Sequence, residues 1–140
     1  MAQLYAGDLY PKDAYKMLQS DKDSALVDVR TVAEWHYVGL PNLKEIDKDV
    51  IRLEWRQLPE MKKNNSFMAS LMNMVPSKET KLLFLCRTGG RSKEAAIEAT
   101  AHGYSTCYNI ADGFEGDLDN NFQRGLTNGW KSAKLPWRQD

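Results

Sequence analysis

The chain contains the stretch Leu82-Leu83-Phe84-Leu85-Cys86-Arg87-Thr88-Gly89-Gly90-Arg91-Ser92, in which an apolar run leads into a cysteine and a short loop. The run is typical of a buried strand, and an alanine-rich segment with helical character follows. The glycines allow backbone N–H groups to turn inward, and a helix start adds unpaired N–H groups and the positive end of its dipole. With two arginines nearby, these effects favour the anionic form of Cys86, which is the reactive nucleophile. The stretch therefore predicts a thiolate that handles small anions.

A structural interpretation of each cysteine has to be weighed against this one. A free cysteine at the end of a strand is often only a small buried apolar residue. Such a residue does not require two arginines, two glycines and a helix start around it, so we interpret Cys86 as functional. Cys107 lies inside an apolar run without positive charge nearby, and we expect it to be inert.

The bulk composition limits the class of protein. The 140 residues are 42% hydrophobic, which fits one domain spanning residues 1–140. Lys plus Arg equals Asp plus Glu at 19 each, so no basic excess indicates nucleic-acid binding. No apolar run is long enough to span a membrane, and the first residues lack the basic and apolar segments of a secretory signal. Two cysteines do not make a disulfide framework, so we expect a reducing cytoplasm.

Strands and helices are expected to alternate along the chain, which predicts an open α/β domain: a parallel sheet with helices on both faces. Cys86 would then lie at the carboxyl end of a strand, where such folds place their sites. Residues 115–129 are expected to form a long surface loop, and 61–65 a polar break. The expected strands are 25–29, 82–85, 105–109 and, more weakly, 43–46; the expected helices are 11–19, 47–57, 67–75 and 92–102, the last ending at Gly103.

The length of the loop separates two kinds of thiolate enzyme. In protein tyrosine phosphatases, five residues lie between the cysteine and the arginine, and the loop encloses a tetrahedral phosphate. Here only four residues lie between Cys86 and Arg91, and Ser92 stands where the phosphatase arginine would be. The tighter loop better suits a sulfur atom carried on the cysteine.

These residues resemble the rhodanese family of sulfurtransferases over nearly the whole chain. Residues 86–92 closely match the family's active-site loop, and 26–30 with Glu34-Trp35 resemble its first signature. Residues 38–43, Val-Gly-Leu-Pro-Asn-Leu, depart from the second signature, since its histidine and second glycine are missing. Further similarities lie at 103–114, 129–130 and 135–137.

The resemblance implies a mechanism and a set of site residues. Cys86 would be the catalytic residue, which takes sulfur from an anionic donor such as thiosulfate, becomes a persulfide and passes the sulfur to cyanide, a thiol or a protein. The donor and the persulfide would be held by the loop, with Arg91 favoured over Arg87 as the inward-pointing cation. Loops near the site would be braced by Asp28, Arg30 and Glu34. The substrate-binding residues would be Arg87, Thr88, Gly89, Gly90, Arg91 and Ser92.

Neither a cofactor nor a metal is expected, because His36 and His102 lack partner ligands at metal-binding spacing. Trp35 is expected to pack rather than to line the site. Two alternatives remain open at this stage. One is a noncatalytic rhodanese module that docks a partner or senses redox state, against which the intact cysteine argues. The other is a phosphatase or arsenate reductase, which the loop length disfavours.

Overall fold

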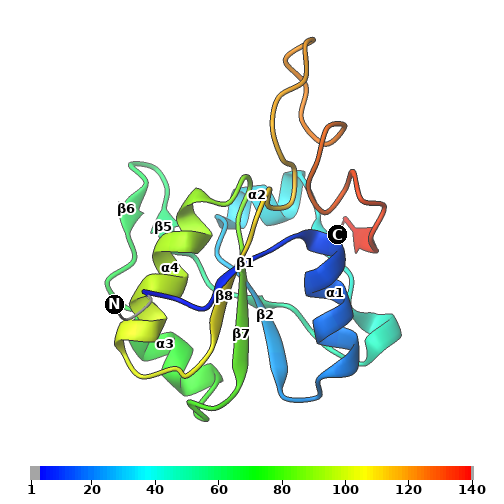
Figure 1. The fold of residues 1–140 in the computed structure, drawn as a ribbon. Coiled ribbons are helices and arrows are strands. Elements are labelled where there is room, and N and C mark those ends of the chain that lie inside the picture. The colour runs from blue at the N-terminus through cyan, green and yellow to red at the C-terminus, as the bar shows by residue number, and fades with distance from the viewer. Residues whose placement is uncertain (1–3, 140) are drawn as a thin grey trace.

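The centre of the molecule is a five-stranded parallel sheet with the strand order β1-β8-β7-β2-β4 (Figure 1). A computed structural model describes residues 4–139. Because all five strands run in one direction, their carboxyl ends gather at one edge of the sheet. The strands are β1 (Gly7–Leu9), β2 (Ser24–Asp28), β4 (Ile51–Arg52), β7 (Lys81–Leu85) and β8 (Cys107–Ile110).

Helices cover both faces of this sheet, which confirms the predicted α/β class. One face is covered by α1 (Pro11–Ser20), and the other by α3 (Phe67–Met74) and α4 (Gly90–Ala101) (Figure 1). A short helix, α2 (Val32–Tyr37), follows β2. The remaining elements are a 3-10 turn, η1 (Lys44–Ile46), and two antiparallel pairs, β3 (Leu40–Pro41) with β9 (Trp137–Arg138) and β5 (Arg56–Gln57) with β6 (Lys62–Lys63).

The alternation of side chains along β7 divides the core into two layers and fixes the direction of Cys86. Leu83 and Leu85 pack on the α1 side of the sheet, and Leu82 and Phe84 pack on the α4 side. Cys86 continues the second row, as expected for the period of two in a strand. Its side chain therefore lies on the face of the sheet that α4 covers.

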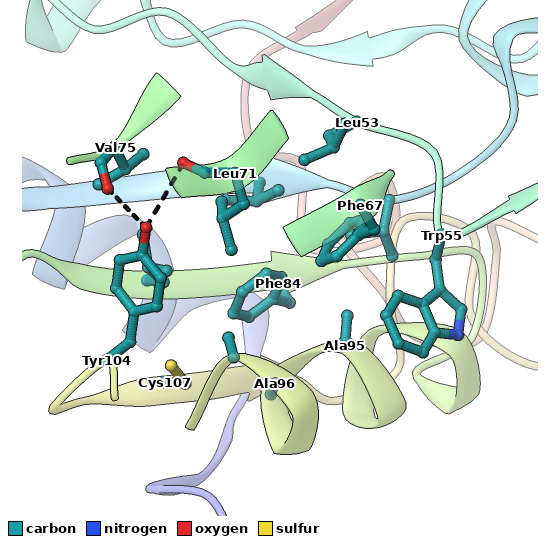
Figure 2. Close-up of a cluster of buried hydrophobic side chains, with 14 of the residues drawn as sticks. Leu53, Trp55, Phe67, Leu71, Val75, Phe84, Ala95, Ala96, Tyr104 and Cys107 are labelled. Carbon is teal, nitrogen blue, oxygen red and sulfur yellow. Dashed lines mark hydrogen bonds between the residues drawn. The ribbon is translucent and has the colours of Figure 1, made fainter. Parts of the chain in front are cut away.

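The α4 side of the core combines aromatic packing with small residues of α4 (Figure 2). Trp55 meets Phe67 edge to face at 4.9 Å between ring centroids. At the other end of this layer, the buried hydroxyl of Tyr104 donates to the carbonyl of Val75, at 2.5 Å, and the carbonyl of Leu71 lies 3.4 Å away (Figure 2). The small side chains of α4 in this layer allow the helix to approach the sheet closely. They belong to Ala95, Ala96 and Ala99.

The predictions for residues 43–57 were wrong. Instead of a strand at 43–46 the chain forms η1, and instead of a helix over 47–57 it forms the edge strand β4 followed by β5. Asp47 adopts a left-handed conformation (φ 56°) that ends η1. Beyond it the chain extends along β2, and Leu53 N–H donates to the Asp28 carbonyl at 3.0 Å. Pairing with a distant strand has therefore outweighed the local helical pattern.

The other predicted elements agree with the structure, apart from small shifts. Helix α3 ends one residue before the predicted end, α4 begins two residues earlier than predicted, and β8 covers 107–110 rather than 105–109. Gly103 has the positive φ (100°) expected of the residue after a helix. Residues 115–129 form neither helix nor strand, as predicted, and they project beyond the rest of the fold (Figure 1). Within residues 4–139, no helix has the length and apolar character needed to cross a membrane.

The close approach at Gly113 gives a test of the fold next to Cys86. A Cβ atom on Gly113 would lie 2.5 Å from the carbonyl oxygens of both Cys86 and Arg87, and its φ is +65°. We expect Gly113→Ala to lower the free energy of unfolding by more than the ~1–2 kcal/mol that a left-handed conformation costs alone. Gly125→Ala is the matched control, since Gly125 also has a positive φ (+88°) but no atom within 4 Å of its Cβ position. If denaturant unfolding shows that both variants lose the same free energy of unfolding, the close approach of Gly113 to the carbonyl oxygens does not contribute.

Candidate active site

Cys86 lies at the carboxyl end of β7, at the base of the loop that leads into α4. Its side chain is 1% exposed. The Gly89 N–H donates to Sγ at 3.0 Å, so the loop folds back over the sulfur atom. Gly89 is the N-cap of α4 and has φ +115°, a conformation that favours glycine. The first turn of α4 therefore starts next to Sγ, and its N–H groups have no partners inside the helix.

The outer side of this loop is bound to the segment that follows β8. The Cys86 carbonyl accepts the N–H of Phe114 at 2.8 Å. The Arg87 carbonyl accepts two N–H groups, from Glu115 at 3.0 Å and Gly116 at 3.1 Å. With its carbonyls bound on this side, the loop can direct N–H groups toward the sulfur on the other. This geometry can hold an anion attached to Cys86.

The two predicted arginines have different surroundings. Arg91 forms a two-bond ion pair with Glu34, at 2.7 and 2.9 Å, and its side chain is 17% exposed. Glu34 also accepts the N–H and the hydroxyl of Thr31, in a capping box at the start of α2. Arg87 is exposed at the outer side of the loop. Arg91 thus ties the active-site loop to α2, while Arg87 presents its charge to solvent.

The pair of Asp28 and Arg30 lies beneath these residues and is fully buried. Arg30 donates from Nε and Nη2 to the Asp28 carboxylate, at 2.9 and 2.7 Å, and from Nη2 to the Gly39 carbonyl at 2.8 Å. Its guanidinium also stacks over the ring of Phe114, 4.3 Å from the centroid. Since Phe114 N–H binds the Cys86 carbonyl, the pair connects the end of β2 to the loop. The bracing role that the family resemblance implies for Asp28, Arg30 and Glu34 stays a prediction, and these contacts are compatible with it.

Asn109 and Asp8 lie at the site but were not predicted from the sequence, and the predicted residue Ser92 links them to the cysteine. Ser92 Oγ lies 3.2 Å from Cys86 Sγ and 2.5 Å from Asn109 Oδ1. Asn109 Nδ2 in turn donates to Asp8 Oδ1 at 3.1 Å. Asn109 lies in β8 and Asp8 in β1, and the two positions are paired neighbours in the sheet. A chain of polar groups therefore runs from the cysteine to the protein surface.

The remaining candidates stand apart from this site. Cys107 is 1% exposed, and burial raises the pKa of its thiol above the ordinary value despite a hydrogen bond from Thr100 that lowers it. Trp35 is packed in the interior, 8% exposed. His102 contacts the Glu98 carbonyl through Nδ1, at 2.9 Å. Among residues 4–139, no three His, Cys, Asp or Glu side chains are grouped so as to hold a metal ion.

The fold and the cysteine loop define a rhodanese-like domain, and known proteins agree with this class. The sequence pattern of the family described as the STR4 middle domain matches residues 7–140. The chain belongs to this rhodanese-like family. Rhodanese-like domain-containing protein 4 of Arabidopsis thaliana, named chloroplastic, is 28% identical over 127 residues, which cover 90% of this chain and 24% of that protein.

Other relatives match over most of their own length. An uncharacterized protein of Rickettsia conorii is 44% identical over 126 residues, covering 89% of this chain and 91% of that protein. The crystal structure of Rv0390 from M. tuberculosis superposes with a TM-score of 0.90 at 43% identity, covering 97% of this chain and 99% of that one. The polysulfide-sulfur transferase homodimer of Wolinella succinogenes shares the fold, with a TM-score of 0.65 at 24% identity, covering 95% of this chain and 78% of that one.

The ion pair between Glu34 and Arg91 predicts a pH dependence of stability. Burial raises the pKa of Glu34, but the hydrogen bonds and charge of Arg91 outweigh it, so the pKa lies below the ordinary value. Such a carboxylate stabilises the fold above the pKa of the unfolded chain, about 4.3, and this contribution is lost as pH falls through the folded pKa. The free energy of unfolding of the parent protein should therefore exceed that of the Glu34→Gln variant most at neutral pH. The difference between the two proteins should shrink as the pH falls. A difference that does not vary with pH would show that the pair contributes nothing through its charge.

Proposed function

We propose that this protein is a sulfurtransferase that carries sulfane sulfur as a persulfide on Cys86. The proposal is carried by the position of Sγ, which accepts the Gly89 N–H at 3.0 Å inside a loop with only four residues between Cys86 and Arg91. With four rather than five residues between the cysteine and the arginine, the loop is tighter than that of the phosphatases, so it suits a sulfur carried on Cys86 better than a tetrahedral phosphate. Rhodanese-like family membership is consistent with this chemistry.

In the first half of the reaction, the Cys86 thiolate attacks the outer sulfur of a donor such as thiosulfate. A bond forms between Sγ and that sulfur, the sulfur–sulfur bond of thiosulfate breaks, and sulfite leaves with the electron pair. In the second half, an acceptor thiolate or cyanide attacks the outer sulfur of the persulfide. The sulfur leaves as an acceptor persulfide or thiocyanate, and Cys86 returns as a thiolate.

The charge of the persulfide resides on its outer sulfur, and the loop provides groups to stabilise it. The N–H groups from Arg87 to Ser92 include those of the first turn of α4, whose dipole also favours an anion. Because Sγ is 1% exposed, an acceptor would meet the outer sulfur rather than Sγ itself. Arg87 at the exposed rim would attract anionic donors, and Arg91 would add positive charge behind the loop.

The partners in this proposal are a small anionic sulfur donor and a thiol or protein acceptor, with no cofactor. A reducing compartment such as the cytoplasm would keep Cys86 available as a thiol between turnovers.

Replacing the nucleophile tests the proposal directly. Cys86→Ser should abolish thiosulfate:cyanide sulfurtransfer without changing the fold, because a serine hydroxyl does not ionise near neutral pH. Cys107→Ser is the matched control and should retain activity, since Cys107 lies in β8 away from the loop. Thiocyanate release by Cys86→Ser at a rate near that of the parent would overturn the proposal. Absence of transfer by the parent protein would favour a docking module, and efficient Cys86-dependent hydrolysis of aryl phosphates would favour a phosphatase.

Arg91→Ala should weaken the use of thiosulfate, because a dianion has to approach a thiolate and positive charge offsets their repulsion. A hydrogen bond to a charged group is worth about 1.5–3 kcal/mol, so we expect kcat/KM to fall roughly 10- to 150-fold. The control is Glu34→Gln, which breaks the same ion pair but keeps the arginine. If both variants lose the same activity, Arg91 acts by bracing the loop rather than through its charge.

A further inference from the structure

The polar groups behind Cys86 form a chain with a defined direction. It runs from Sγ to Ser92 Oγ at 3.2 Å, to the Asn109 amide at 2.5 Å and to the Asp8 carboxylate at 3.1 Å. Ser92 is fully buried and Asn109 is 4% exposed, whereas Asp8 reaches the surface. Buried polar groups in such a chain must share their protons, because water is not available to replace a missing partner.

The carboxylate at the outer end fixes the orientation of the amide. An ionised carboxylate only accepts hydrogen bonds, so the Asn109 NH2 group must face Asp8. The Tyr5 hydroxyl also donates to Asp8, at 2.9 Å to the same oxygen. The carbonyl oxygen of Asn109 is then left facing Ser92. Since this oxygen only accepts, the hydrogen of the Ser92 hydroxyl has to point at Asn109.

The direction of the Ser92 hydroxyl hydrogen determines whether Cys86 Sγ faces a donor or an acceptor. A hydroxyl has one proton to donate, and the short contact to Asn109 uses it. The side of Ser92 Oγ that faces Sγ therefore carries a lone pair, which accepts a hydrogen from a thiol and is unfavourable toward a thiolate. To stabilise a thiolate, Ser92 has to turn its hydrogen away from Asn109.

We propose that Asp8 and Asn109 are positioning residues that orient the Ser92 hydroxyl so that the resting cysteine is held as a thiol donating to Ser92. The catalytic meaning of this inference rests on the proposed function. Ionisation of Cys86 then requires the Ser92 hydroxyl to rotate its hydrogen toward Sγ, and the thiol proton leaves to solvent. Once the persulfide forms, Sγ carries no charge and Ser92 can return to Asn109. These polar groups thus favour the thiol form of Cys86, whereas the loop N–H groups favour the thiolate. The thiolate is then limited to the step in which Cys86 attacks the sulfur donor.

Other charges around Cys86 are the same in every variant of the test. The loop contributes Arg87, and α4 contributes Arg91, paired with Glu34 of α2, together with Lys93 and Glu94. Asp28 at the end of β2 and Arg30 after it form the buried pair, and the backbone of Asp112 lies next to Gly89. A change in the ionisation of Cys86 between variants of Ser92, Asn109 and Asp8 therefore reports on these three residues.

The experiment measures the thiolate fraction of Cys86 by its ultraviolet absorbance, with Cys107→Ser in all proteins so that one thiol remains. It is made at a pH where only a small fraction of the parent thiol is ionised. Asn109→Leu should raise that fraction roughly three- to tenfold, because the freed hydrogen of Ser92 then turns to Sγ and contributes about one hydrogen bond. In a Ser92→Ala background, Asn109→Leu should have no such effect.

A surface variant keeps the test decisive if a buried leucine prevents folding. Asp8→Ala releases the Asn109 amide and should raise the thiolate fraction in the same direction by a smaller factor, at high ionic strength, where the lost charge itself is screened. The inference is overturned if neither variant raises the thiolate fraction, or if the rise persists without the Ser92 hydroxyl. Because no sulfur donor is used, the result is independent of whether the protein transfers sulfur.

Discussion

The carbonyl groups of Cys86 and Arg87 are held by three N–H groups of residues 114–116, and the rest of the site depends on this constraint. With these acceptors bound on the outer side, the loop can fold back so that Gly89 N–H contacts Sγ. The same arrangement brings the start of α4 to the sulfur. Cys86 Sγ thus meets a backbone donor, the Gly89 N–H, whose position is set by the sheet and by the segment after β8.

Two ion pairs extend this constraint across the carboxyl edge of the sheet. Asp28 and Arg30 are buried together, and Arg30 reaches both the turn at Gly39 and the ring of Phe114. Glu34 and Arg91 join α2 to α4. A buried charge is costly unless it is paired, so loss of either partner would leave the other unsatisfied next to the loop. Both pairs therefore join elements that surround the loop.

The sequence predicts the parts of the structure that depend on local pattern. Apolar runs predict β2 and β7, which the structure confirms, and the composition of the loop predicts that Cys86 is the nucleophile, which stays a prediction. Residues 47–57 were misassigned because the pairing of Ile51 with Val27 in β2 is invisible locally, although alternation of the apolar residues 51, 53 and 55 has the period of a strand. Asn109 and Asp8 were missed because they are 101 residues apart and meet only through the pairing of β8 with β1.

The central claim is that Cys86 itself carries the transferred sulfur. The most direct test is the mass of the purified protein after incubation with thiosulfate and removal of excess donor, followed by mapping of the peptide that contains Cys86. The account predicts a gain of one sulfur atom on this peptide, reversed by cyanide and absent from Cys86→Ser. A protein that gains no sulfur, or that gains it equally after Cys86→Ser, would contradict the account.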